Sequence, residues 1–227
     1  MTLITHIRNK KIVVIAGDSQ HTHTDFNGHE TTFLVQIQRR KVYNFKDCIL
    51  GIYGGASNAF VVWLESLDET KRLNTTLDSV KNKCNEIIKD HYDNYDVYSL
   101  VIGTYKKSII AIYPKSYFIE LNTKNSNIDY ADEEIEYIRT KDVFFSPQGS
   151  KQQIDKLEKT FNELFMEIYA SPFDIEKLDN DRNLDKLLKR FYQVIESNPE
   201  LNNGLIDGNV KYHILDLRNF SISNLSE

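Results

Sequence analysis

Continuous and alternating apolar runs along the chain predict short strands that come in consecutive pairs. Residues 3–7 and 11–16 are two such runs on either side of the turn-prone Asn9-Lys10, and the second is almost entirely β-branched. Together they predict a buried hairpin. Similar runs predict further strands at residues 33–37, 41–45, 48–53, 98–103, 108–113, 116–121, 142–145 and 210–215, and an edge strand at 220–223.

Apolar residues at helical spacing predict four helices. In the first, Phe60, Trp63, Leu64 and Leu67 recur three or four positions apart, which places them on one helix face. The predicted helices are residues 56–67, 77–91, 150–169 and 184–195. Polar segments predict a long loop or a pair of ragged strands at 19–32, an acidic loop at 129–136, and a linker or a ragged helical turn at 170–183.

The order of these elements predicts the fold class. The strands follow one another with short turns, whereas a parallel crossover needs about a dozen residues or more, so antiparallel sheets are favoured. Strand groups followed by helix groups, twice over, are typical of an α+β fold. We therefore expect one domain over residues 1–227, built as a four-layer αββα sandwich of two antiparallel sheets with helices on both outer faces.

Composition narrows the class of protein. With 41% hydrophobic and 27% charged residues, the chain is typical of soluble globular proteins, and no segment reaches the ~18 apolar residues of a membrane span. Acidic and basic residues are mixed, with a net charge of −5, which argues against nucleic acid as a partner. Cys48 and Cys84 lie in apolar segments and are expected to be buried thiols, and the start lacks a signal-peptide pattern. A cytoplasmic protein that begins near Met1 is expected.

The residue after the initiator methionine is a threonine. A threonine hydroxyl is a weak nucleophile unless a base lies within hydrogen-bond reach. A terminal amine, with a pKa of about 7.7–8.0, can be that base on the same residue. Because a small second residue generally permits removal of Met1, the sequence allows Thr2 to carry both the nucleophile and its base.

Three stretches carry a resemblance to a known family. They read TLITHI from residue 2, IVVIAGDSQ from residue 12, and KVYNFKDCILGIYGG from residue 41. This pattern resembles the HslV-type and proteasome β subunits, which are N-terminal nucleophile (Ntn) hydrolases. The resemblance is close over roughly the first 65 residues and only architectural beyond them.

The resemblance implies a role for each matching residue. Thr2 would be the nucleophile, Lys41 would lie beside its hydroxyl, and Asp18 would hold that lysine charged. An ammonium near the hydroxyl and the amine lowers both of their pKa values. The backbone N–H of Gly55 would face the oxyanion, and Ser150, preceded by a glycine, would lie beside the terminal amine.

Several positions remain open at this stage. Ser146 competes with Ser150 for the same role, because the run FFSPQGS can be shifted by four residues, and Ser150 is also a candidate helix N-cap. The resemblance further implies that His21, Tyr53 and Gly54 contact substrate. The family has a further carboxylate and serine near the last helix, where this chain has the sequence NNG from residue 202.

A metal site was considered in the loop that bears several histidines. Its candidate ligands are His21, His23, His29, Asp25 and Glu30. Their spacing matches no closed zinc pattern, and solvated side chains of a polar loop beside a substrate groove account for them better. We expect neither a metal nor an organic cofactor.

The resulting hypothesis is a threonine endopeptidase that cleaves amide bonds in peptides or unfolded protein. The resemblance also implies a homo-oligomeric ring with an enclosed chamber and an ATP-dependent unfoldase as a partner. Two alternatives remain. The same fold could hydrolyse a small amide, or the chain could be a non-catalytic structural subunit that retains Met1.

Overall fold

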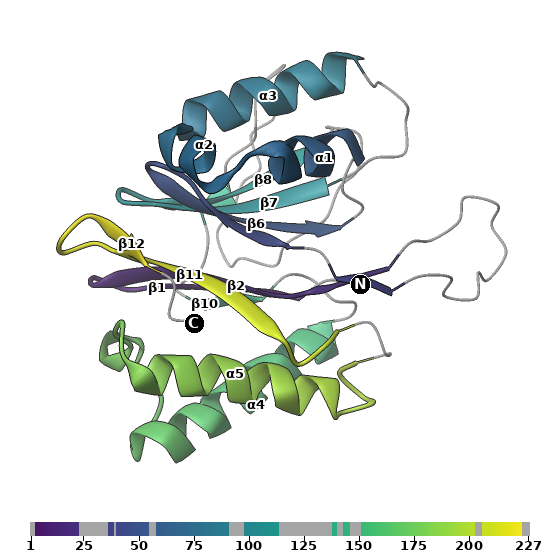
Figure 1. The fold of residues 1–227 in the computed structure, drawn as a ribbon. Helices are drawn as coiled ribbons and strands as arrows, with labels where there is room; N and C mark the ends of the chain where they lie inside the picture. Colours follow the sequence, from purple (N-terminus) through teal and green to yellow (C-terminus); the bar gives the residue numbers. More distant parts are fainter. Residues whose placement is uncertain are drawn as a thin grey trace, which may run out of the picture.

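The computed structural model describes residues 3–22, 36–38, 40–54, 58–90, 98–113, 138–139, 143–145, 151–202 and 206–223. These residues form four layers: three helices, two stacked sheets, and two further helices (Figure 1). The predicted αββα sandwich of antiparallel sheets is confirmed. The strands are β1 (Ile4–Arg8), β2 (Ile12–Asp18), β3 (Gln20–Thr22), β4 (Gln36–Gln38), β5 (Val42–Asn44), β6 (Cys48–Gly54), β7 (Tyr98–Thr104), β8 (Ser108–Tyr113), β9 (Ile138–Arg139), β10 (Val143–Phe145), β11 (Val210–Asp216) and β12 (Ser221–Ser223). The helices are α1 (Asn58–Ser66), α2 (Glu69–Asn74), α3 (Leu77–Asp90), α4 (Lys151–Tyr169), the 3-10 turn η1 (Ile175–Lys177) and α5 (Arg182–Glu196).

The two large sheets are built from different parts of the chain. The first has the order β10-β1-β2-β11-β12, so the last strands of the chain pair beside the first hairpin. The second has the order β5-β6-β7-β8-β9. All pairings within them are antiparallel. The register of β11 against β2 sets Val210 opposite Asp18, which brings the start of β11 to the end of β2.

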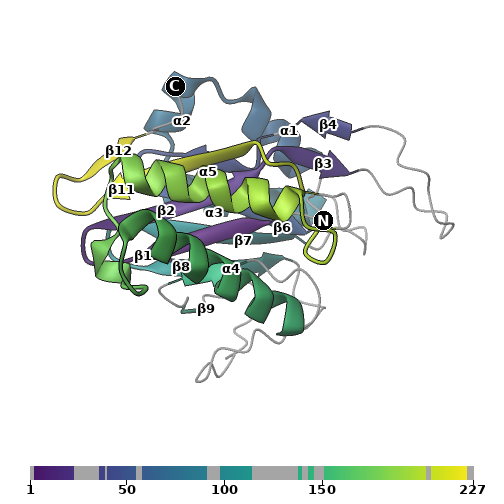
Figure 2. The same ribbon diagram turned by 90° about the horizontal axis from the view of Figure 1, so that it is seen from below.

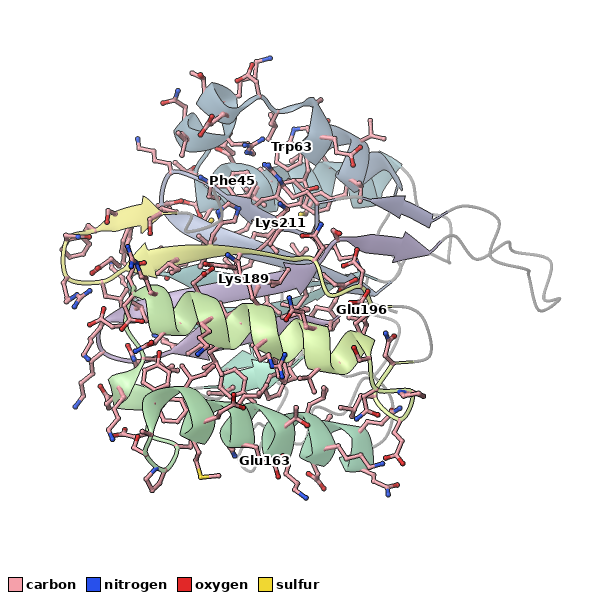
Figure 3. The ribbon with its side chains drawn as sticks, turned by 60° about the horizontal axis from the view of Figure 1, so that its bottom comes forward. Phe45, Trp63, Glu163, Lys189, Glu196 and Lys211 are labelled. Carbon is pink, nitrogen blue, oxygen red and sulfur yellow. The ribbon has the colours of Figure 1, made fainter. Side chains whose placement is uncertain are left out.

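Three apolar clusters fill the three interfaces between the four layers. One lies between the first sheet and the helices α4 and α5, which run side by side across that sheet (Figure 2). A second lies between the second sheet and the helices α1 and α3, and it includes Phe45 and Trp63 (Figure 3). The third lies between the two sheets and includes Ile4, Ile15 and Ile49.

Alternation along the strands distributes side chains among these clusters. In β1 and β2, Ile7 and Val14 face the helices, while Ile4 and Val13 face the second sheet. Every residue of β2 is buried, because both faces of this central strand are covered. The uninterrupted apolar run in the sequence is a direct consequence of that coverage.

Two glycines allow the sheets to approach each other. A Cβ at Gly51 would lie 2.8 Å from Cγ2 of Ile15 and 3.0 Å from Cγ2 of Ile4, both in the opposite sheet. A Cβ at Gly17 would lie 2.8 Å from Cδ1 of Ile4 on the neighbouring strand and 3.1 Å from Cγ2 of Val42 in the opposite sheet. Real Cβ atoms do not approach so closely, so any larger residue would push the sheets apart.

The sequence pattern does not predict the short elements α2 and β9. Helix α2 has no buried residue and begins at Asp68, whose carboxylate accepts a hydrogen bond from the Lys71 N–H. The strand β9 has two residues. The turn η1 lies within residues 170–183, for which the sequence predicts a linker or a ragged helical turn. The predicted strand 116–121, the acidic loop 129–136 and the candidate N-cap Ser150 lie outside the described residues. Within the described helices, none is long and apolar enough to span a bilayer.

Both cysteines are buried thiols, as expected from their apolar surroundings. A less common feature of the core is His6, whose side chain is fully buried on the face of β1 that includes Ile4. Neither ring nitrogen has a hydrogen-bond partner among the described residues. Burial, together with the nearby charge of Arg8, lowers the pKa of His6 to about 3.

This histidine should make stability depend on acid. Unfolding releases it to an ordinary pKa of 6.5, so the unfolded chain binds more protons below that pH. The contribution of His6 to stability is complete above pH 6.5 and is lost towards pH 3, by about 2 kcal/mol between pH 7 and pH 5. We expect His6→Leu to lose less stability than the wild type over this range in urea unfolding. Equal losses would contradict the assignment.

The close approach of the sheets can be tested at Gly51. Gly51→Ala introduces a methyl group against Ile15 and Ile4, and overpacking of this kind costs about 1–3 kcal/mol. Val62→Ala, at a side chain that is 59% exposed, should change the free energy of unfolding by less than about 0.5 kcal/mol. Urea denaturation of both variants measures the difference, and equal effects would show that the sheets are not in tight contact.

Candidate active site around a buried lysine and aspartate

A buried ion pair joins the two sheets. Asp18 is the last residue of β2 in the first sheet, and Lys41 directly precedes β5 in the second. The Lys41 Nζ donates a hydrogen bond to Asp18 Oδ2 at 2.6 Å, and the two side chains are only 4% and 0% exposed. Gly17, without a side chain, leaves the space that the Lys41 side chain and Ile4 occupy.

The second oxygen of the same carboxylate binds the beginning of the chain. The Leu3 backbone N–H donates to Asp18 Oδ1 at 3.0 Å. The Leu3 nitrogen is covalently bonded to the carbonyl carbon of residue 2. The carboxylate that binds Lys41 is therefore also hydrogen-bonded to the residue that follows Thr2 in the sequence.

Backbone contacts hold Lys41 in position. The Ile52 N–H donates to the Lys41 carbonyl at 2.9 Å, which extends the pairing of β5 and β6 by one step. The Tyr43 hydroxyl donates to the carbonyl of Arg40 at 2.8 Å, so the preceding peptide is also bonded. The lysine side chain thus leaves a fixed backbone and has a fixed partner at its end.

Burial and the ion pair act on these charges in opposite directions. Burial raises the pKa of Asp18 to about 6, and this rise is opposed by Lys41 and by the Leu3 N–H. Burial lowers the pKa of Lys41, and Asp18 opposes that shift. At neutral pH the carboxylate is ionised, and its charge favours the ammonium form of the lysine.

A second carboxylate lies near this pair. Asp207 accepts hydrogen bonds from the backbone N–H of Ser19 at 3.0 Å and from its hydroxyl at 2.6 Å. Its negative charge raises the pKa of both Asp18 and Lys41. Asp207 is not among the site residues that the sequence pattern indicates. The available signal was its place in a turn just before the predicted strand 210–215, but only the register of β11 against β2 brings it to Ser19.

The other predicted site residues are placed as follows. Tyr53 is 5% exposed and lies between the sheets, with its ring centroid 6.4 Å from that of Phe144. Gly54 ends β6, and His21 lies in β3 opposite Ile37. The remaining candidates, Thr2, Gly55, Ser146 and Ser150, lie outside the described residues, as do His23, Asp25, His29 and Glu30 of the loop considered for metal. The part of the chain that the structure describes holds no group of three potential metal ligands.

Solved structures similar to this chain include BPH, with and without a bound compound, and HslV. BPH of Thiobacillus denitrificans in complex with epoxomicin is 16% identical, with a TM-score of 0.47 over 96% of this chain and 99% of that chain. BPH alone is 17% identical, with a TM-score of 0.47 over 96% and 98%. Eukaryotic HslV from Trypanosoma brucei is 14% identical, with a TM-score of 0.47 over 94% and 99%. No family model and no curated protein matches the chain.

The ion pair should dominate the response of stability to substitution here. Lys41→Met leaves a buried carboxylate without its cation, which should cost about 3 kcal/mol at pH 7. The cost should shrink at pH 5, because the carboxyl, whose pKa rises further without the lysine, then binds a proton. Lys11→Met, at an exposed pair with Asp179, should cost no more than about 1 kcal/mol. Urea unfolding at both pH values measures this, and a pH-independent cost would refute it.

Proposed function

We propose that this chain is a threonine-type peptidase in which Thr2, freed by removal of Met1, attacks the carbonyl carbon of a peptide bond. The observation that carries the proposal is the Asp18 carboxylate, which binds the Lys41 ammonium and the Leu3 N–H at once. A buried cation beside the first peptide of a chain is costly as a structural device. Such a cation is useful where a hydroxyl must lose its proton and the neighbouring amine must be uncharged to accept it.

The first chemical step follows from this charge arrangement. The terminal amine of Thr2 takes the hydroxyl proton as the oxygen attacks, and the Lys41 ammonium lowers the pKa of both groups. The backbone N–H of Gly55 is assigned to the negative charge that develops on the carbonyl oxygen. The C–N bond of the peptide then breaks, the leaving amine takes this proton from the Thr2 amine, and the acyl group remains as an ester on Thr2.

The second step releases the product. Water attacks the ester, and the amine of Thr2 again accepts and returns a proton, which restores the free hydroxyl. Ser150, or Ser146 in its place, is proposed to orient that amine. The proposed substrate is an extended peptide or unfolded protein, with His21, Tyr53 and Gly54 along the binding groove. Neither step requires a metal or an organic cofactor.

The same resemblance supports a quaternary arrangement. The stretches around Thr2, Asp18 and Lys41 resemble those of subunits that form rings with enclosed sites. We propose that this chain assembles with copies of itself in the same manner and receives substrate from an ATP-dependent unfoldase. Enclosure would restrict cleavage to chains that are already unfolded.

A two-headed electrophile tests the proposed nucleophile. Epoxomicin, which BPH of Thiobacillus denitrificans binds, is an epoxyketone with two electrophilic carbons, one for a hydroxyl and one for an adjacent amine. We expect intact-mass measurement to show a chain without Met1 that gains the whole mass of one reagent molecule. The same preparation should hydrolyse a fluorogenic peptide, and the reagent should stop this hydrolysis.

Matched variants decide the outcome. Thr2→Ala should form no adduct and hydrolyse no peptide, because both steps need its hydroxyl. Thr70→Ala, in the exposed helix α2, should behave as the wild type does. Retained hydrolysis in Thr2→Ala would refute the assignment. Retention of Met1 together with absence of hydrolysis would favour a structural subunit, and turnover of small amides alone would favour the small-amide enzyme.

A further inference from the structure

The tyrosine near the end of α5 reaches the beginning of the chain. Tyr192 lies one turn before the end of this helix and is fully buried against the first sheet. Its hydroxyl is 3.2 Å from the Leu3 carbonyl oxygen, 3.0 Å from the Ala16 carbonyl oxygen and 3.2 Å from Thr5 Oγ1. One proton can be shared between the two carbonyls, while the Thr5 hydroxyl donates to the tyrosine oxygen.

These contacts begin where the pairing of strands stops. The ladder between β1 and β2 ends at Ile4 opposite Gly17. One residue earlier, side chains replace the ladder: the Leu3 N–H binds the Asp18 carboxylate, and the Leu3 carbonyl binds the Tyr192 hydroxyl. Leu3 is thus held by side chains at both of its backbone polar groups.

Holding both polar groups restricts the direction in which the chain leaves Leu3. A single hydrogen bond at the N–H would leave rotation about the bonds to Cα open, while a second at the carbonyl fixes the orientation of both peptides. The next residue towards the start is Thr2. Its side chain can lie beside Lys41 only if these two peptides keep their orientation.

The helix α5 is itself held firmly. Asp181 caps its start by accepting from the N–H groups of Asn183 and Leu184. Its apolar face is buried in the cluster below the first sheet. Figure 3 shows the helix along β11, with Glu196 at the end nearest the start of that strand. The Tyr192 hydroxyl is therefore positioned by a firmly packed helix.

We infer that Tyr192 is a positioning residue, which acts through the Leu3 carbonyl to set the place of the Thr2 side chain relative to the Lys41 ammonium. The inference rests on the proposed function. The tyrosine touches no substrate and exchanges no proton in the reaction. Burial raises the pKa of its hydroxyl, which keeps it neutral and able to donate.

A thiol at position 2 can report this placement without any catalysis. In Thr2→Cys, an ammonium beside the side chain lowers the thiol pKa and speeds alkylation at neutral pH. The rate with iodoacetamide, measured against pH, gives the thiol pKa in the folded chain and in the same chain unfolded in urea. Cys48 and Cys84 are buried and are shielded from the reagent in the folded protein.

The effect of Tyr192 is measured in the chain that carries Thr2→Cys. Adding Tyr192→Phe keeps the ring and removes only the hydroxyl, so the thiol should drift from Lys41. We expect alkylation at pH 7 to slow about threefold and the thiol pKa to move towards its unfolded value. In the chain with Thr2 intact, kcat for peptide hydrolysis should fall about tenfold with little change in KM, since the nucleophile and not the binding groove is displaced.

Tyr212→Phe is the matched control. Tyr212 is buried in the same cluster, and its hydroxyl bonds Asp185, which lies two turns before Tyr192 on the same helix. This variant therefore loses a part-buried hydrogen bond between the first sheet and the same helix. We expect it to leave the thiol pKa and kcat unchanged. Equal effects of the two variants would reduce Tyr192 to a structural role and overturn the inference.

The remaining outcomes are separable. If the thiol introduced by Thr2→Cys has the same pKa folded and unfolded, residue 2 does not lie beside Lys41 and the proposed function fails. If that pKa is lowered but Tyr192→Phe leaves it unchanged, only the positioning inference fails. Should Tyr192→Phe not fold, Thr5→Val removes the hydroxyl that bonds Tyr192 and should slow alkylation to a smaller extent. An unchanged rate in that variant also overturns the inference.

Discussion

The carboxylate of Asp18, buried between the two sheets, determines how closely those sheets must approach each other. It binds Lys41 from one sheet and the Leu3 N–H from the other, and both of its oxygens are occupied. A charge removed from water in this way is tolerated only when its partners are close and well oriented. The sheets must therefore meet at short distance, which the glycines at positions 17 and 51 permit.

The site is assembled from the two ends of the described chain. The first hairpin supplies Asp18, and the segment from α5 to β11 supplies Tyr192 and Asp207, whose hydrogen-bond partners precede them by 176 residues or more. The register of β11 against β2 makes this possible, because it sets the start of the late strand beside the end of the early one. Stability of the first sheet and geometry of the site are therefore linked.

Charge and burial oppose each other throughout this region. Burial alone would favour a neutral acid at Asp18 and a neutral amine at Lys41, while their contact favours the ionised forms. His6 shows the other solution, an imidazole in the core that stays neutral because no described residue compensates its charge. The pair keeps its charges where the proposed chemistry needs them, whereas His6 stays uncharged.

Elements that bury apolar side chains could be predicted from the amino-acid sequence, because burial imposes a hydrophobic period along the chain. The first hairpin, the strand at Ser108–Tyr113 and the helix α5 are examples. The sequence also singled out Asp18 and Lys41 through a local pattern that resembles a known family. The places of Tyr192 and Asp207 beside the first hairpin depend on the tertiary fold. Tyr192 and Asp207 look like an ordinary helix residue and an ordinary turn residue, since their partners are distant in sequence and hydrogen bonds between distant residues leave no periodic trace.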